Sequence, residues 1–112
     1  MFRVSFYTPA RKVSPVKEFL DSCQSRLRVK ILRQLQYIQE FGLSPVIPNL
    51  KKIKNTPLWE LRILGKDNVR IICASFSQKE IKVIHVFRKK KRKMPLKELN
   101  LALKRYQEML DS

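Results

Sequence analysis

The sequence predicts an α+β domain in which an antiparallel four-stranded sheet carries three helices, in the order β-α-α-β-β-β-α. The main observation is a set of three short runs rich in Ile, Val and aromatic residues, Pro57–Leu64, Val69–Phe76 and Ile81–Phe87. The segments between them, 65–68 and 77–80, are polar and carry turn residues, which indicates an antiparallel meander. Apolar residues at helical spacing elsewhere in the chain predict the helices.

Length and charge limit the classes of protein that this chain can belong to. Its 112 residues predict a single domain over residues 1–112, and the hydrophobic fraction of 44% is sufficient for a modest core. The 25 basic and 9 acidic residues give a net charge of +16, which predicts a polyanionic partner: RNA, DNA, an anionic membrane or an acidic protein. No apolar run approaches the length that spans a membrane, so we expect a cytoplasmic protein.

The cysteine and histidine content predicts no metal site. Cys23 and Cys73 are far apart in sequence, and neither forms a paired spacing with the other or with His85. We therefore expect two core cysteines, no disulfide, no metal and no cofactor.

The N-terminal segment predicts a strand followed by a short helix. Phe2, Val4 and Phe6 alternate with polar residues, which is typical of a half-buried strand. Ser14 and Pro15 then fit the N-cap and the first position of a helix.

A second helix is predicted from a break near residues 22–25 to Phe41, with Gly42 placed as the residue that follows the helix. The loop that follows contains Pro45 and Pro48 and leads to three lysines. These lysines either lie along the mouth of a surface built by the meander or belong to a solvated loop; they are Lys51, Lys52 and Lys54.

The C-terminal segment predicts an amphipathic helix that covers part of the sheet, with Pro95 at its first position. We expect the N-terminal strand to pair at an edge of the meander and the first two helices to pack on one face. The other face then stays partly open.

Two arginines inside the predicted strands, Arg62 and Arg70, point to a functional site. A cation in a strand is costly unless it is solvated or paired. Glu60 and Glu80 could pair with them, but 25 bases share 9 acids, so we favour phosphate binding.

Taken together, an ordered set of residues resembles the RelE/HigB superfamily, and more closely the phage-derived RelE-like toxins of type II toxin–antitoxin modules. The resemblance runs from the first strand to the last helix. It departs from the family pattern at Lys91 and Met94, where small hydroxyl residues are common. The residues that carry it are Leu58–Arg62, Val69–Ile71, Ile84–Lys90, Lys93, Pro95, Glu98, Ala102 and Arg105.

This resemblance implies a RelE-like fold and a toxin that cleaves mRNA in the ribosomal A site without a metal. It further implies that a helix-turn-helix antitoxin holds the toxin inactive. The partners would be this antitoxin, the ribosome and mRNA, with no membrane. In the family pattern the strand arginines face phosphate, which carries over to Arg62 and Arg70. The family's His-x-Phe-x-Lys-Lys segment likewise carries over to His85, Phe87, Lys89, Lys90 and Lys93.

The chemistry of RNA cleavage assigns roles to the remaining polar residues. The reaction needs a base for the 2′-hydroxyl, stabilisation of an anionic phosphorane, and a proton for the leaving 5′-oxygen. Arginines suit the second task, and a histidine or a lysine with a lowered pKa suits the others. The predicted catalytic set is Arg62, Arg70, His85 and Lys90. The predicted RNA-binding set is Lys51, Lys52, Lys54, Phe87, Arg88, Lys89, Lys91, Arg92 and Lys93.

Several alternatives stay open at this point. His85 shares strand parity with Val83 and Phe87, so it can be a structural histidine rather than a catalytic one. Phe87 can be a core residue rather than a stacking platform for a base. The whole chain can be a non-catalytic nucleic-acid-binding module, or a degenerate toxin that acts as a repressor partner.

Overall fold

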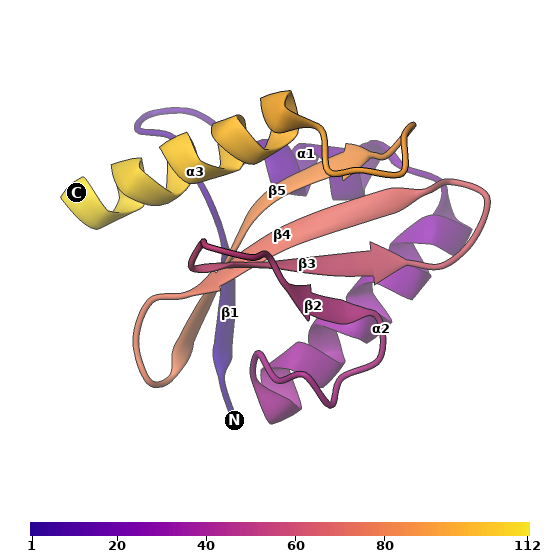
Figure 1. Cartoon of the computed structure of the whole chain (residues 1–112), viewed down its shortest axis with the longest axis horizontal. Helices are drawn as coiled ribbons and strands as arrows, with labels where there is room; N and C mark the ends of the chain where they lie inside the picture. The colour runs from indigo at the N-terminus through magenta and orange to yellow at the C-terminus, as the bar shows by residue number, and fades with distance from the viewer.

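The computed structural model describes residues 1–112 and shows a five-stranded sheet with helices on both faces (Figure 1). The strand order is β1-β5-β4-β3-β2; β1 runs parallel to β5, and the other neighbours are antiparallel. The elements are β1 (Arg3–Phe6), α1 (Pro15–Ser22), α2 (Ser25–Phe41), β2 (Leu50–Lys52), β3 (Leu58–Ile63), β4 (Val69–Ser75), β5 (Glu80–Arg88) and α3 (Leu96–Asp111).

The α+β class and the meander are confirmed, but the expectation of a four-stranded antiparallel sheet is wrong in two respects. The additional strand, β2, spans only three residues, too few to show alternation in the sequence. It forms because Leu50 and Lys51 pair with Leu61 and Glu60 of β3. The parallel direction of β1 has no local signal, because it depends on where the meander ends.

The predicted ends of the first two helices are confirmed. The Ser14 hydroxyl accepts a hydrogen bond from the Lys17 amide at 3.3 Å, with Pro15 at the first helical position. Gly42 adopts φ +76° and donates its amide to the Ile38 carbonyl at 2.8 Å, which closes α2. At the other end of the chain, Pro95 precedes α3 as its N-cap rather than beginning it.

Two hydrophobic cores hold the helices on the sheet. The larger core packs α1 and α2 against one face and includes Ile31, Ile38 and Leu61. The smaller core packs α3 against the other face around Ile72 and Ala102. Because β4 contributes to both cores, it is buried along nearly its whole length, as expected for a central strand covered on both sides.

A β-bulge in β5 changes which side chains share a face. Ile72 pairs with His85, whereas the next residue, Cys73, pairs with Val83, so Ile84 has no partner of its own in the register. Val83 packs in the core under α2, and Phe87 packs in the core under α3. The predicted shared parity of Val83 and Phe87 is therefore wrong. None of the three helices has the length and hydropathy needed to cross a membrane.

Candidate nucleic-acid interface

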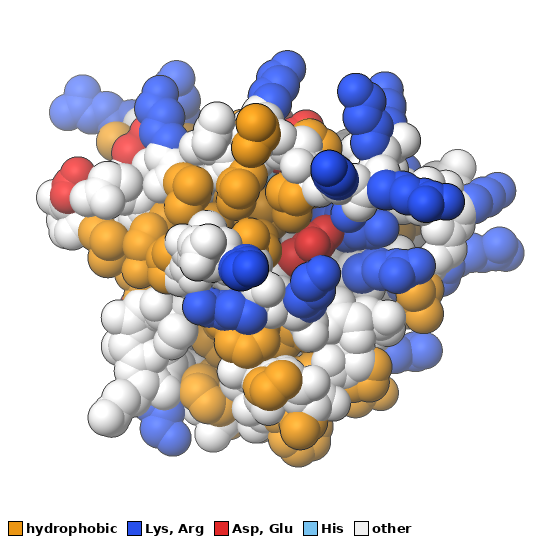
Figure 2. Space-filling model, in the orientation of Figure 1, with side chains coloured by type: hydrophobic (Ala, Val, Ile, Leu, Met, Phe, Trp, Pro, Cys, Tyr) orange, Lys and Arg blue, Asp and Glu red, His pale blue; other side chains and the backbone are white.

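The α3 face of the sheet is only partly covered, and its open part forms a charged hollow that we call the sheet pocket. Its volume is about 220 Å³. Figure 2 shows acidic atoms flanked by several lysine and arginine side chains on this side of the molecule. The lining residues are Asn49, Leu50, Lys51, Glu60, Arg62, Arg70 and Lys89.

Strand alternation brings the charged side chains of the sheet pocket together. Along β3, Leu58 packs under α3, and Glu60 and Arg62 follow at the two-residue spacing that keeps them on this face. Lys51 lies opposite Glu60 in the register, and Arg70 lies opposite Arg62. The pocket is therefore a direct product of the pairing of β2, β3 and β4.

Glu60 lies at the centre of the sheet pocket and contacts two of its four cations. Its Oε2 atom is 3.2 Å from Arg70 Nε and 3.9 Å from Lys89 Nζ. The Arg70 contact lacks hydrogen-bond geometry, so this buried oxygen accepts no hydrogen bond. With Lys51, Arg62, Arg70 and Lys89 against one carboxylate, the charge lining the pocket is 4 − 1 = +3. An anion that enters the pocket meets an unneutralised positive field.

Arg62, like Lys51, is a cation of the sheet pocket that is free to meet a ligand. Its side chain is exposed, and its guanidinium makes no hydrogen bond or ion pair within the protein. It also faces Arg70 directly across the β3–β4 ladder. Like charges directly opposite each other destabilise a sheet, and an anion placed between them removes that cost.

His85 lies outside the sheet pocket, in a buried network with α3. Its Nε2 atom is 2.7 Å from Glu98 Oε1, and its Nδ1 atom is 3.1 Å from Arg105 NH1. Because a guanidinium can only donate, Nδ1 accepts and Nε2 carries the proton that Glu98 accepts. Burial lowers the pKa of His85, and the hydrogen bond to Glu98 opposes this shift. Both ring nitrogens are occupied, which favours the structural alternative for this residue.

Phe87 is also placed in the interior. It is 6% exposed, belongs to the core under α3, and stacks on the His85 ring at a centroid distance of 5.4 Å. This position favours the core alternative over stacking on an RNA base.

The predicted basic residues are only partly brought together. Lys51 and Lys89 line the sheet pocket. Arg88 is exposed, contacts Asp67 Oδ1 at 3.1 Å and lies over the Phe19 ring. The other predicted cations are exposed and do not line the pocket; these are Lys52, Lys54, Lys90, Lys91, Arg92 and Lys93.

Sequence reasoning treated Glu60 only as an ion-pair partner, missed Asn49, and named Arg105 only as part of the family pattern. The alternation of Glu60 with Arg62 in β3 was the available signal for a carboxylate in the same site. The family pattern contained Arg105 but gave no sign of its contact with His85, because that contact depends on how α3 packs. No cluster of three or more His, Cys, Asp or Glu side chains is arranged to hold a metal ion. Burial raises the pKa of Cys73 to about 12, so its thiol is unreactive.

Comparisons with known proteins agree with this fold. Residues 18–107 match the family described as "Phage derived protein Gp49-like (DUF891)". Among solved structures, a free-state arginine-to-alanine double mutant of the E. coli toxin RelE is similar, with a TM-score of 0.65 and 18% sequence identity. The match covers 93% of this chain and 96% of the RelE chain, which confirms a RelE-like fold. No curated protein sequence shows significant similarity.

Proposed function

The chain belongs to the family of phage-derived Gp49-like proteins, and we propose that it is the toxin of a type II toxin–antitoxin module. In this proposal it is a ribosome-dependent endoribonuclease that cleaves mRNA and thereby inhibits translation in the cytoplasm. Its partners are the ribosome, mRNA and a helix-turn-helix antitoxin. The observation that carries the proposal is the sheet pocket, where Arg62 and Arg70 face each other beside a single carboxylate.

The sheet pocket supplies the groups that RNA cleavage requires. The scissile phosphate binds between Arg62 and Arg70, whose guanidinium forks stabilise the charge that builds up on the phosphorane. Lys51 contributes further positive charge at the pocket wall. No metal is needed in this scheme, because the arginines carry the electrostatic role.

Proton transfer is assigned to Glu60 and Lys89. Glu60 is the only carboxylate that lines the pocket, and it accepts the proton of the 2′-hydroxyl. The 2′-oxygen then bonds to phosphorus, the bond from phosphorus to the 5′-oxygen breaks, and Lys89 protonates that leaving oxygen. The products are a 2′,3′-cyclic phosphate and a free 5′-hydroxyl. Lys90, the lysine that the sequence placed in the catalytic set, is exposed and does not line the pocket.

The remaining predicted residues have docking or positioning roles. The exposed run from Lys90 to Lys93 contacts phosphates of ribosomal RNA, an interaction that weakens as salt rises. His85 positions α3 relative to β5 through Glu98 and Arg105, because it joins side chains of both elements.

The test is the variant Arg62→Ala with Arg3→Ala as its matched control. Both arginines are exposed on strands, and neither side chain makes an internal ion pair or hydrogen bond, so neither change disturbs the fold. We expect Arg62→Ala to reduce cleavage of translated messages by about 100-fold, in line with the loss of one transition-state donor. Arrest of growth and primer extension on cellular mRNA measure the effect. Full cleavage by Arg62→Ala would remove the sheet pocket from the mechanism.

A second candidate, a non-catalytic RNA-binding module, is favoured by one observation. His85 is the only histidine of the chain, and both of its ring nitrogens are engaged inside the protein. A protein of this second kind would stall ribosomes without producing cut message ends, so the same primer-extension experiment separates the two functions. A degenerate toxin acting as a repressor partner would produce neither cut ends nor stalled ribosomes.

A further inference from the structure

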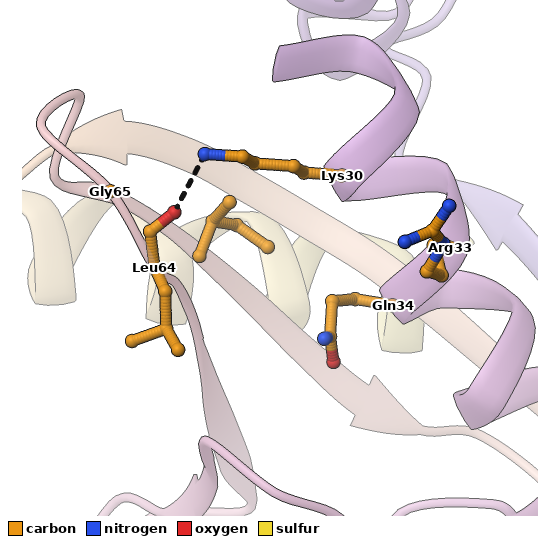
Figure 3. A pocket seen from close by; sticks show the side chains of 6 residues that line it. Lys30, Arg33, Gln34, Leu64 and Gly65 are labelled. Atoms are coloured by element: carbon orange, nitrogen blue, oxygen red, sulfur yellow. Dashed lines mark hydrogen bonds between the residues drawn. The ribbon is translucent and has the colours of Figure 1, made fainter. Parts of the chain in front are cut away.

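A second basic hollow lies on the opposite face of the sheet from the sheet pocket, between α2 and the turn that follows β3. We call it the helix cleft (Figure 3). Its volume is about 360 Å³, and Ile63 of the core under α2 forms part of its wall. The lining residues are Lys30, Arg33, Gln34, Ile63, Leu64 and Gly65.

The cations of the helix cleft are not neutralised within the protein. Lys30 Nζ donates only to the neutral Leu64 carbonyl, at 3.3 Å, and Arg33 makes no ion pair or hydrogen bond. No carboxylate lines the cleft. Arg26 precedes Lys30 by four residues, so Arg26, Lys30 and Arg33 form a stripe on one side of α2 with neighbours about 5–6 Å apart. The stripe presents successive positive charges, as the backbone of a nucleic acid requires.

Gln34 adds an unmet hydrogen-bond acceptor to this cationic wall. Its side-chain Oε1 atom is buried and has no partner, a condition that costs free energy. Gln34 lines the cleft, and because the terminal torsion of glutamine is broad, a rotation about it would present this oxygen to a donor on a ligand. A ligand that pairs with both the cations and the Gln34 oxygen therefore carries a negative charge and a hydrogen-bond donor close together.

Gly65 keeps the floor of the helix cleft open. It adopts φ +130°, and a Cβ atom there would lie 2.8 Å from Lys30 Nζ. A larger residue would push the lysine from its position at the cleft. Glycine at this position therefore preserves both the turn and the placement of the ammonium group.

We propose that the helix cleft binds the sugar–phosphate backbone of ribosomal RNA, while the sheet pocket receives the message. Lys30 and Arg33 contact phosphate, and Gln34 accepts a hydrogen bond from a ribose 2′-hydroxyl. The 2′-hydroxyl is the group that distinguishes RNA from DNA. One nucleotide carries the anion and the hydroxyl side by side, which matches this wall better than the isolated carboxylate of an acidic side chain. The naming of ribosomal RNA as the source rests on the proposed function.

The test compares two variants that remove the same charge. Lys30→Gln/Arg33→Gln alters the helix cleft, and Lys12→Gln/Lys104→Gln removes two exposed cations elsewhere. All proteins carry Arg62→Ala so that they can be expressed without growth arrest, and thermal melting checks their folding. Binding of each full chain to purified vacant ribosomes is measured across a series of salt concentrations. We expect the cleft variant to bind about tenfold more weakly with a salt slope smaller by about 1 to 2, and the control to change less than about twofold.

A third variant, Gln34→Leu, tests the acceptor separately from the charge. We expect it to weaken binding to an RNA hairpin without changing the salt slope, and to leave binding to a DNA hairpin of the same sequence unaltered. Equal losses on RNA and DNA would remove the 2′-hydroxyl contact from the proposal.

The outcomes separate this inference from the proposed function. If the cleft variant binds ribosomes as well as the matched control does, the inference is overturned, whatever the sheet pocket does. If it binds ribosomes normally but loses a purified acidic antitoxin, the cleft is a protein interface and the inference is equally overturned. Cleavage by the chain that carries the native Arg62 is measured in the earlier experiment, so a failure of the ribonuclease proposal is visible independently.

Discussion

Replacing Arg70 with alanine tests whether this guanidinium stabilises the fold as well as binding phosphate. Arg70 Nε lies 3.2 Å from Glu60 Oε2, and the two side chains are only 11% and 14% exposed. Removing one partner of a buried ion pair leaves an uncompensated charge and costs about 3–5 kcal/mol. Lys89, 3.9 Å from the same oxygen, compensates in part, so we expect a loss of about 3 kcal/mol. At roughly 4 °C per kcal/mol, this lowers the melting temperature by about 12 °C.

The measurement is a double-mutant cycle on the free energy of unfolding in urea. Glu60→Gln completes the cycle, and the pair Arg70→Ala/Glu60→Gln removes both charges. We expect the double variant to regain about 2 kcal/mol relative to Arg70→Ala, since no buried carboxylate remains unpaired. Neither variant that carries Arg70→Ala cleaves RNA, because both lack the guanidinium group that binds the phosphate. A double variant as unstable as Arg70→Ala would refute the reasoning, since it would show that Glu60 does not depend on Arg70.

Two further predictions concern the parts of the fold that support the site. Burial lowers the pKa of His85 in the folded protein. Once the pH falls below about 6.5, the unfolded chain therefore binds more protons than the folded protein, and the free energy of unfolding decreases until the pH reaches the pKa of the folded state. An NMR titration of this single histidine should give a midpoint below about 6.5 and a still lower one in Glu98→Gln. A midpoint above about 6.5 would contradict the dominance of burial over the Glu98 hydrogen bond. Gly42→Ala should cost about 2 kcal/mol in urea unfolding, because φ is +76° and the added Cβ would lie 2.6 Å from the Phe2 ring. Unchanged stability would show that this strained contact relaxes freely.

Local sequence signals predicted the elements better than they predicted the arrangement of the elements. Ser14 and Gly42 mark helix ends because capping depends on a few neighbouring residues. By contrast, the direction of β1 and the existence of β2 depend on partners that are distant in sequence. No local pattern contains that information.

The same distinction applies to the site. Arg62 and Arg70 could be identified because a cation within a strand needs a specific reason to be there. The catalytic role of His85 and the stacking role of Phe87 rested on side-chain chemistry and on the family resemblance, whereas the bulge at Ile84 together with the packing of α3 places both residues in the interior. A bulge of this kind has no reliable sequence signature.

The position of Arg70 explains why this sheet carries a pocket and not a second complete helical cover. On the α3 face of β4, Ile72 and Ala74 are apolar and lie in the core that α3 covers, whereas Arg70, two residues earlier, lies beyond α3 among the charged side chains of the sheet pocket. An arginine beneath a helix would need full desolvation, so the apolar cover must end where the arginine begins. The resulting concentration of positive charge is unfavourable in the free protein, and any anion that binds there stabilises the folded state by mass action. RNA affinity and stability should therefore both depend on salt, and the anion that rescues the stability of the fold should be the one that competes with RNA.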